Sequence, residues 1–280
     1  MRALFLTAAL AVAPFSTLAN ETSKVLSIGG SVTEIVYALG QQDRLIARDS
    51  TSSFPAEANA LPDVGYMRAL SPEGVLSVGP ELIISEDGAG PVETIDVLKQ
   101  ANIPFVVVPD KYSSDGIVAK IKAVGDALNA QTEAEALAAE VASKIAEAEA
   151  TAANLAGEEK QRVLFILSTQ GGRIMASGTN TAADGIITMA GGVNVIESFE
   201  GYKQLSDEAI SAAAPDVILM MDRGGDHGAA NEELFAFPGL IGTPAAQTES
   251  VIRMNGLYLL GFGPRTGDAV LDLAQALYAG

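Results

Sequence analysis

The sequence predicts an α/β protein with two lobes that are joined by a long helix. Three observations support this prediction. Short β-branched runs alternate with helical patterns, one helix-strand unit occurs twice, and a segment rich in helix-forming residues separates the two copies. A length of 280 residues suits two packed domains.

Helical patterns separate the runs that are typical of buried strands. Such alternation predicts parallel sheets that are covered on both faces. The runs are Val25–Ile28, Leu82–Ser85, Phe105–Val108, Val163–Leu167 and Val217–Met221.

A repeated unit indicates that the two halves have related folds. The first copy begins with Leu-Ser-Pro-Glu-Gly-Val at 70–75, which precedes Pro-Glu-Leu-Ile-Ile. The second copy begins with Leu-Ser-Asp-Glu-Ala-Ile at 205–210, which precedes Pro-Asp-Val-Ile-Leu. In each copy we expect a serine, Ser71 or Ser206, to cap a helix that has an acid in its first turn, followed by a turn and a buried strand. A weaker echo relates residues 34–40 to residues 185–191.

The segment between the copies is rich in Ala, Glu and Lys, and only Asn129-Ala130-Gln131 interrupts it. It predicts a stiff connecting helix and divides the chain into an N-terminal lobe (20–113), a connecting helical segment (114–157) and a C-terminal lobe (158–280). A ligand cleft is expected between the lobes, at the carboxyl ends of the strands. One apolar stripe of the segment comprises Ala134, Leu137, Val141, Ile145 and Ala148.

The first 19 residues have the pattern of a cleaved signal peptide. Arg2 is the only charge before Glu21, an apolar run follows Arg2, and Thr17-Leu18-Ala19 provides small residues for cleavage. No later segment is long and apolar enough to span a membrane, and the chain has no cysteine to carry a lipid. We therefore expect a periplasmic protein without direct membrane insertion.

Charge and motif content exclude several classes of function. A net charge of −18 repels nucleic acid and anionic lipid, but it allows docking onto a basic protein surface. The sequence has one histidine and no phosphate loop or nucleophile elbow, so no enzyme is predicted. A chelatase-like enzyme, the alternative from this class, would require metal-binding carboxylates that face the cleft.

The loop at residues 61–70 contains the most informative pair, Tyr66 and Arg68. In an extended segment residues two apart point to the same side, so Arg68 would hydrogen-bond the phenol and favour phenolate. A phenolate is a hard oxygen donor that suits ferric iron and serves as an axial ligand of haem. The alternative is a tyrosine packed on its neighbours beside a solvated arginine.

The run Gly-Tyr-Met-Arg-Ala-Leu-Ser at 65–71 resembles the signature of the periplasmic haem-binding proteins of haem ABC importers. The resemblance extends along nearly the whole mature chain, including residues 176–184, 201–206 and 260–266. It implies two Rossmann-like lobes bridged by a helix, haem as the transported ligand, Tyr66 as the axial iron ligand and Arg68 as its support.

The same resemblance implies partners. Glu73 and Glu208, one on each lobe, match glutamates that dock onto arginines of an ABC permease, which works with its ATPase at the inner membrane. The repeat places the two acids equivalently, and both also complement helix dipoles. A monomer is expected, with haem handed over from an outer-membrane receptor.

Further candidates follow from the chemistry of haem. Some relatives carry a histidine in the loop that matches residues 168–171; this chain has none there, so a second stacked haem is not expected. The only histidine, His227, is the candidate for a second haem contact. Candidate propionate partners are Arg173, Lys203 and Arg265, and candidate pocket walls are Met67, Met175, Tyr202 and Phe262.

Two other ligands remain open on this fold, a ferric siderophore and a corrinoid (vitamin B12). Tyr66 and Arg68 discriminate between these ligands and haem. A siderophore already saturates its iron, so it gains nothing from a tyrosinate and would instead require several basic residues.

Overall fold

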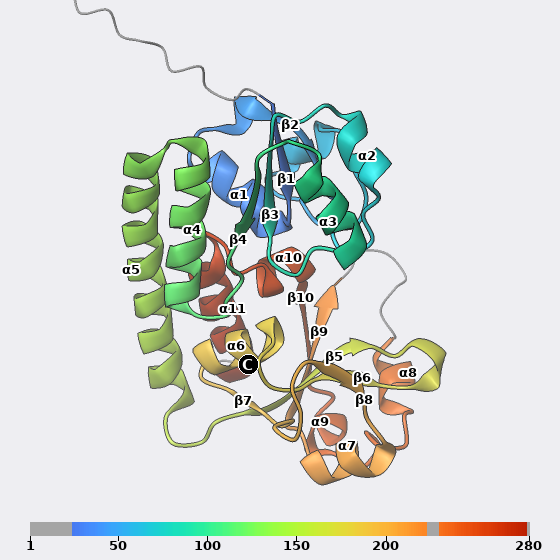
Figure 1. Ribbon diagram of the computed structural model, residues 1–280. Coiled ribbons are helices and arrows are strands. Elements are labelled where there is room, and N and C mark those ends of the chain that lie inside the picture. The colour runs from blue at the N-terminus through green and yellow to red at the C-terminus, as the bar shows by residue number, and fades with distance from the viewer. Residues whose placement is uncertain (1–23, 223–229, 279–280) are drawn as a thin grey trace, which may run out of the picture.

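A computed structural model describes residues 24–222 and 230–278 and shows an α/β protein of two lobes (Figure 1). Each lobe has its own sheet, and two long helices lie on one side of the molecule. The predicted signal peptide and His227 lie outside the described residues. None of the helices in 24–222 and 230–278 is long and apolar enough to cross a membrane.

The N-terminal lobe contains a four-stranded sheet in which all neighbours are parallel, in the order β2-β1-β3-β4. Its central strands are buried along their whole length, as expected where both faces of a parallel sheet are covered. The strands are β1 (Val25–Ile28), β2 (Leu45–Arg48), β3 (Leu82–Glu86) and β4 (Phe105–Val108). The helices are α1 (Gly30–Ala38), η1 (Gln42–Arg44), η2 (Ala56–Ala60), α2 (Pro72–Ser77) and α3 (Val92–Gln100).

The C-terminal lobe contains a six-stranded sheet in the order β10-β9-β5-β6-β8, with β7 paired to β5. The strands are β5 (Arg162–Ser168), β6 (Met175–Ser177), β7 (Val193–Asn194), β8 (Tyr202–Gln204), β9 (Val217–Asp222) and β10 (Val251–Asn255). The helices are η3 (Gln170–Gly172), α6 (Ala182–Met189), α7 (Asp207–Ala213), α8 (Asn231–Phe235), α9 (Pro244–Gln247), α10 (Gly256–Leu260) and α11 (Thr266–Tyr278).

One edge of the C-terminal sheet departs from the predicted parallel arrangement. β6 runs antiparallel to both β5 and β8, so the sheet is mixed. Only a few residues separate Ser168 from Met175, and a parallel pairing would require a crossover connection of about a dozen residues or more. The prediction of parallel sheets in both lobes was therefore wrong for this edge.

The repeated units have the predicted form. The Ser71 hydroxyl accepts a hydrogen bond from the Gly74 N–H at 3.0 Å, and the Ser206 hydroxyl accepts one from the Ala209 N–H at 3.3 Å. These caps start α2 and α7, which lead into the buried strands β3 and β9. The weaker echo also corresponds to two helices, α1 and α6.

The connecting segment forms two helices, α4 (Ser114–Leu128) and α5 (Gln131–Ala156). The chain breaks at the predicted place, where Asn129 adopts the left-handed conformation with φ of 56°. α4 then lies beside α5, so α5 alone runs from one lobe to the other (Figure 1). A Cβ atom on Gly125 would lie 2.2 Å from the Cβ of Ala134, so this close approach of the two helices requires glycine.

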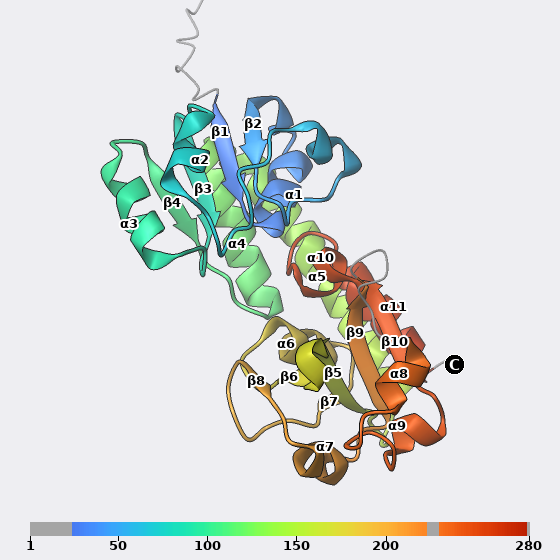
Figure 2. The same ribbon diagram turned by 90° about the vertical axis from the view of Figure 1, so that its right-hand side faces the viewer.

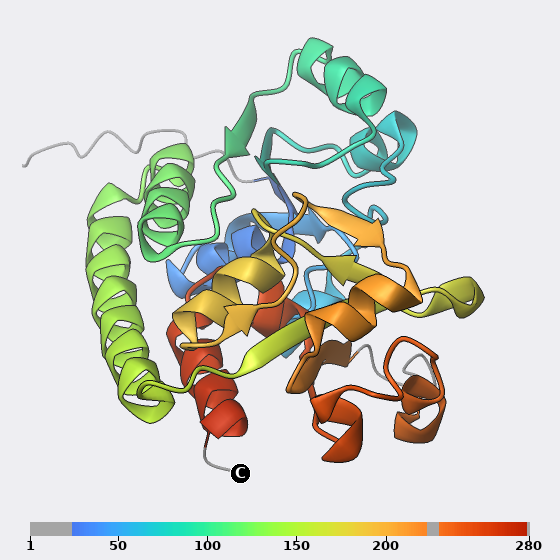
Figure 3. The ribbon, with the colours of Figure 1, turned by 90° about the horizontal axis from the view of Figure 1, so that it is seen from below.

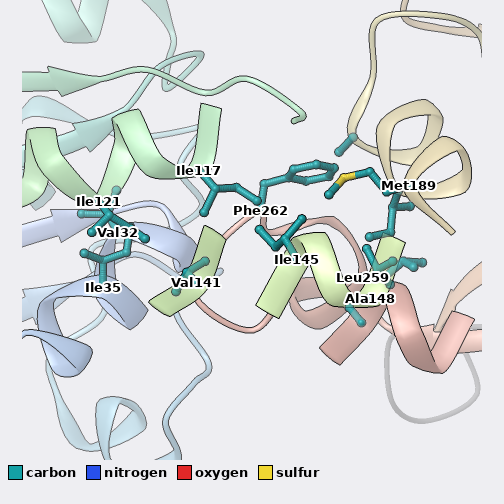
Figure 4. Packing of buried hydrophobic residues seen from close by; sticks show 14 of the residues in the cluster. Val32, Ile35, Ile117, Ile121, Val141, Ile145, Ala148, Met189, Leu259 and Phe262 are labelled. Carbon is teal, nitrogen blue, oxygen red and sulfur yellow. The ribbon is translucent and has the colours of Figure 1, made fainter. Parts of the chain in front are cut away.

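One hydrophobic core extends through both lobes, and each lobe also has a smaller cluster of its own. It joins Val32 of α1 and Ile121 of α4 to Val141 of α5 and, farther along, to Leu259 and Phe262 near the C-terminus (Figure 4). α11 packs along α5 and extends this core into the C-terminal lobe (Figure 3). Because moving the lobes apart would break this packing, the core favours one fixed arrangement of the lobes.

The C-terminal segment crosses to the N-terminal lobe, and α10 lies between the two sheets (Figure 2). A Cβ atom on Gly30 of α1 would lie 2.4 Å from a methyl carbon of Leu257 of α10. Arg265 donates from Nε and Nη2 to the two carboxylate oxygens of Glu34, at 3.0 and 2.9 Å. Glu34 is almost fully buried and Arg265 is partly exposed, so this ion pair is a partly buried contact between the lobes.

Candidate ligand-binding site

Tyr66 lies in an exposed turn at the carboxyl end of the N-terminal sheet. Its side chain is 47% exposed, and its carbonyl accepts a hydrogen bond from the Ala69 N–H at 2.8 Å. The Leu70 N–H donates to the Gly90 carbonyl at 3.0 Å, and the Gly90 N–H donates to the Met67 carbonyl at 2.9 Å. The turn is thereby fixed against the loop that follows β3, and it holds the phenol in an exposed position.

The turn corrects the prediction of an extended segment. Residues two apart do not share a side in a turn, and no described residue forms a hydrogen bond with the Tyr66 phenol or the Arg68 guanidinium. The predicted hydrogen bond between these two side chains is therefore absent in the described part of the chain. The guanidinium remains an exposed positive charge two residues from the phenol.

Each lobe contributes a partly buried tyrosine near the end or start of a strand. Tyr112 follows β4, and Tyr202 begins β8 on the opposite lobe. Burial raises the pKa of Tyr202 and raises the pKa of Tyr112 to about 12, and in both the Arg68 charge acts in the opposite direction.

The rings of both tyrosines pack edge-on against phenylalanines. The ring centres of Tyr112 and Phe262 are 5.3 Å apart, and those of Tyr202 and Phe165 are 6.3 Å apart. The first pair joins the lobes, because Phe262 lies beyond α10 in the C-terminal segment. Sequence analysis identified Tyr202 and Phe262 but missed Tyr112, which is marked only by its position at the carboxyl end of β4.

The raised pKa of Tyr112 predicts a loss of stability at high pH. Between about pH 10 and about pH 12 the unfolded chain releases the Tyr112 proton while the folded chain retains it, so stability falls as pH rises. Because the side chain is only half-buried, we expect the effect to be on the order of 1 kcal/mol. Urea unfolding at increasing pH should show a shallower decline in Tyr112→Phe; parallel declines in the two proteins would contradict the prediction.

The candidate wall residues have different environments. Met67 and Phe262 are buried, in the core of the N-terminal lobe and in the shared core respectively, so both pack as core side chains. Met175 and Tyr202 are partly buried, near the antiparallel edge of the C-terminal sheet. Of the four, only these two present side-chain surface at that edge.

The candidate propionate partners also differ. Arg173 is exposed and donates to the Gln204 side chain at 3.2 Å, and Lys203 is exposed and lies over the Phe199 ring at 5.1 Å. Arg265 is already paired with Glu34, and its guanidinium carbon lies 3.6 Å from the centre of the Phe54 ring. It therefore functions as a contact between lobes in this structure, and Arg173 and Lys203 remain the more available cations of the three.

A buried charge cluster below the site was missed by sequence analysis. Lys120 of α4 is fully buried and donates to Glu86 at 2.5 Å, to Asp110 at 2.8 Å and to the Ser31 hydroxyl at 3.0 Å. It also reaches the Gly261 carbonyl of the C-terminal segment at 3.4 Å. Burial raises the pKa of Glu86, while the Lys120 charge opposes this shift. The cluster fixes the ends of β3 and β4, and with them the loop that carries Tyr112.

The two acids predicted to dock onto a partner occupy equivalent places. Glu73 and Glu208 are exposed and lie in the first turns of α2 and α7. Both helices lie on the side of the molecule away from α5, one on each lobe (Figure 1). Hydrogen bonds from its own backbone N–H and from the Ser206 hydroxyl lower the pKa of Glu208, so this acid is charged at neutral pH.

No group of three or more His, Asp or Glu side chains that could hold a metal ion occurs in 24–222 and 230–278. A cavity of about 530 Å³ lies at the base of the C-terminal lobe, next to Gln161, Thr248 and Tyr278. It is separate from the Tyr66 loop, and none of the candidate residues lines it.

Comparisons with known proteins place the chain among solute-binding proteins. It matches the family described as periplasmic binding protein over residues 25–256. It is 27% identical to a vitamin B12-binding protein of Vibrio parahaemolyticus, over 92% of this chain and 91% of that protein.

Two solved structures are more similar in sequence. The periplasmic heme-binding protein RhuT from Roseiflexus sp. RS-1 is 38% identical, with a TM-score of 0.87, over 92% of this chain and 98% of that one. The periplasmic heme-binding protein BhuT, in complex with two hemes, is 36% identical, with a TM-score of 0.86, over 91% and 98%. The predicted two-lobed α/β fold and the prediction of a binding protein are thus confirmed, and the chain belongs to the periplasmic binding protein family as the solute-binding component of an ABC importer.

Proposed function

We propose that this protein binds haem in the periplasm and delivers it to the inner-membrane permease, with the Tyr66 phenolate as the axial ligand of the haem iron. Tyr66 itself carries the proposal, as an exposed phenol in a fixed turn beside the charge of Arg68. The turn lies at the carboxyl edge of a parallel sheet, where ligands bind in open α/β folds. Two solved structures named for heme binding are 36% and 38% identical to this chain.

The chemistry of the turn suits ferric haem. A phenolate supplies a hard anionic oxygen to the iron. The exposure of Tyr66 leaves its oxygen free for a ligand, since no described residue bonds to it. We propose one haem per chain, because residues 168–171 contain no histidine for a second.

A corrinoid is the second candidate, because the Vibrio parahaemolyticus relative is named for vitamin B12. A corrinoid carries its own cobalt ligands, so it would not use the phenolate. A ferric siderophore has a saturated iron and would leave Tyr66 without a role. Tyr66 therefore favours haem over both.

A competition experiment tests the ligand. The mature protein is mixed with equal concentrations of ferric haem, cyanocobalamin and a ferric hydroxamate siderophore, and the protein peak from gel filtration is examined by its absorption spectrum. We expect haem alone to co-elute. Preferential co-elution of either other ligand would overturn the proposal.

The same proposal includes location and route. The leader over residues 1–19 would direct export and be cleaved, releasing a soluble periplasmic monomer. An outer-membrane receptor would supply the haem. The haem would then pass through the permease, which works with an ATPase. A permease and an ATPase are the partners of substrate-binding proteins of ABC transporters.

We predict that Glu73→Ala and Glu208→Ala each weaken docking onto the permease by roughly tenfold or more, because each leaves basic groups of the partner unpaired. The measurement is the concentration of loaded protein that half-maximally stimulates ATP hydrolysis by the reconstituted permease and ATPase. Glu93→Ala, an exposed acid in the first turn of α3, is the matched control. Equal concentrations for all three variants and the wild type would contradict the docking role.

A further inference from the structure

The loop between α8 and α9 is apolar and lies at the surface of the C-terminal lobe. Residues 236–242 are Ala-Phe-Pro-Gly-Leu-Ile-Gly, without a charged or polar side chain, in a protein with a net charge of −18. Ile241 is 62% exposed, the only exposed large hydrophobic side chain among the described residues of this lobe. Ala236, Pro238 and Gly242 are exposed as well. Such an exposed apolar run indicates a surface that contacts another molecule.

This apolar loop has a fixed conformation. Leu240 is fully buried in the hydrophobic cluster of the C-terminal lobe, and the Thr243 hydroxyl donates to its carbonyl at 2.7 Å. The N–H groups of Leu240 and Ile241 donate to the Phe237 carbonyl at 2.9 and 3.2 Å. Leu240 thus anchors the loop while its neighbour Ile241 stays at the surface. Because the loop is already ordered, docking would cost little additional conformational entropy.

The apolar loop is attached to the helix that carries Glu208. The Gly239 N–H donates to the Asp207 carboxylate at 3.1 Å, and the Ser211 hydroxyl donates to the Gly239 carbonyl at 3.1 Å. A Cβ atom on Gly239 would lie 2.9 Å from the Asp207 Cα, so this close approach requires glycine. The loop therefore adjoins the first turn of α7, where Glu208 is exposed (Figure 1).

An exposed acid next to an apolar surface defines the kind of partner that fits. The acid requires a basic group, and the apolar loop requires an apolar surface that excludes water from the contact. A permease is the membrane partner of a solute-binding protein of an ABC importer. Glu208 is proposed above to dock onto basic groups of that permease, and the apolar loop is held directly beside this acid.

We propose that the apolar loop docks together with Glu208 onto the permease, and that Ile241 packs into an apolar pocket beside the basic group of that protein. This inference rests on the proposed docking role of Glu208 and adds an apolar contact to it. A charge at the rim of an interface mainly speeds association, whereas a buried apolar side chain mainly slows dissociation. The two residues are therefore expected to have different kinetic effects.

Binding kinetics with the permease and ATPase of the same importer, held in lipid nanodiscs, test this role. The mature protein is used without added haem, so the result does not depend on the identity of the ligand. Ile241→Ser should weaken binding by about tenfold through faster dissociation, with an unchanged dependence on salt. Glu208→Ala should slow association and reduce the salt dependence. Ile241→Leu keeps the apolar surface and should bind within about threefold of the wild type.

Val97→Ser is the matched control, because Val97 is 48% exposed on α3 of the other lobe. Equal dissociation rates for Ile241→Ser, Val97→Ser and the wild type would overturn the inference, while weaker binding of Glu208→Ala would leave its docking role intact. If Glu208→Ala also binds as the wild type does, the proposed docking role fails too. Self-association of the wild type in analytical ultracentrifugation, abolished by Ile241→Ser, would show that a second copy covers the loop and would overturn the inference.

Discussion

Replacing Tyr66 with Phe is expected to lower the affinity for ferric haem by at least about a hundredfold and to abolish the phenolate charge-transfer band. Loss of outer-shell partners of metal ligands already costs about tenfold to a hundredfold in affinity, so loss of the iron ligand itself should cost more. Phe keeps the ring and removes only the oxygen. The effect would therefore be assigned to the bond with iron.

The structure supports a clean measurement of this effect. Tyr66 is 47% exposed in a turn that is held by backbone hydrogen bonds, so its hydroxyl contributes little to the fold. Tyr37→Phe, on the partly buried end of α1, serves as the control for loss of a phenol elsewhere. An unchanged charge-transfer band in Tyr66→Phe would exclude Tyr66 as the axial ligand and direct attention to His227.

The second large effect is expected at Lys120. Lys120→Met keeps the aliphatic side chain but leaves the Glu86 and Asp110 carboxylates without their buried cation, which should cost about 3–5 kcal/mol of unfolding free energy. Urea unfolding at neutral pH gives this value. The double variant Lys120→Met/Glu86→Gln should recover part of the loss, because one of the unpaired charges is then removed.

A neighbour in the same helix provides the control for Lys120. Lys122 forms an exposed ion pair with Glu135 at 2.9 Å, and Lys122→Met should cost no more than about 1 kcal/mol. If the two single variants cost the same, burial of the Lys120 cluster contributes nothing to stability. That result would also remove the reason to regard the cluster as the support of the Tyr112 loop.

Much of the fold follows from local sequence patterns. Serine followed by an acid predicted the starts of α2 and α7, and the Asn-Ala-Gln interruption predicted the break between α4 and α5. These features depend on hydrogen bonds and backbone conformations within a few residues, so they can be read from adjacent positions. The antiparallel edge at β6 depends on the short connection after β5, which the strand pattern alone does not show.

The candidate site was only partly predictable, because its side chains find their partners far away in the sequence. Lys120 occupies a core position of the α4 stripe, three residues after Ile117, but a lysine there is expected to be exposed unless its partners are known. Those partners come from the end of β3, from the loop after β4 and from α1. Arg265 pairs with Glu34 across 231 residues of sequence, and Phe262 of the C-terminal segment packs on Tyr112 of the other lobe. Such pairings arise from tertiary packing, which a single sequence does not specify.

A visible absorption titration of residues 20–280 with ferric haem would show whether this solute-binding protein carries haem on Tyr66. We expect a Soret band that shifts until one equivalent is bound, together with a charge-transfer band of phenolate ligation. The absence of a saturable shift would rule out haem as the ligand.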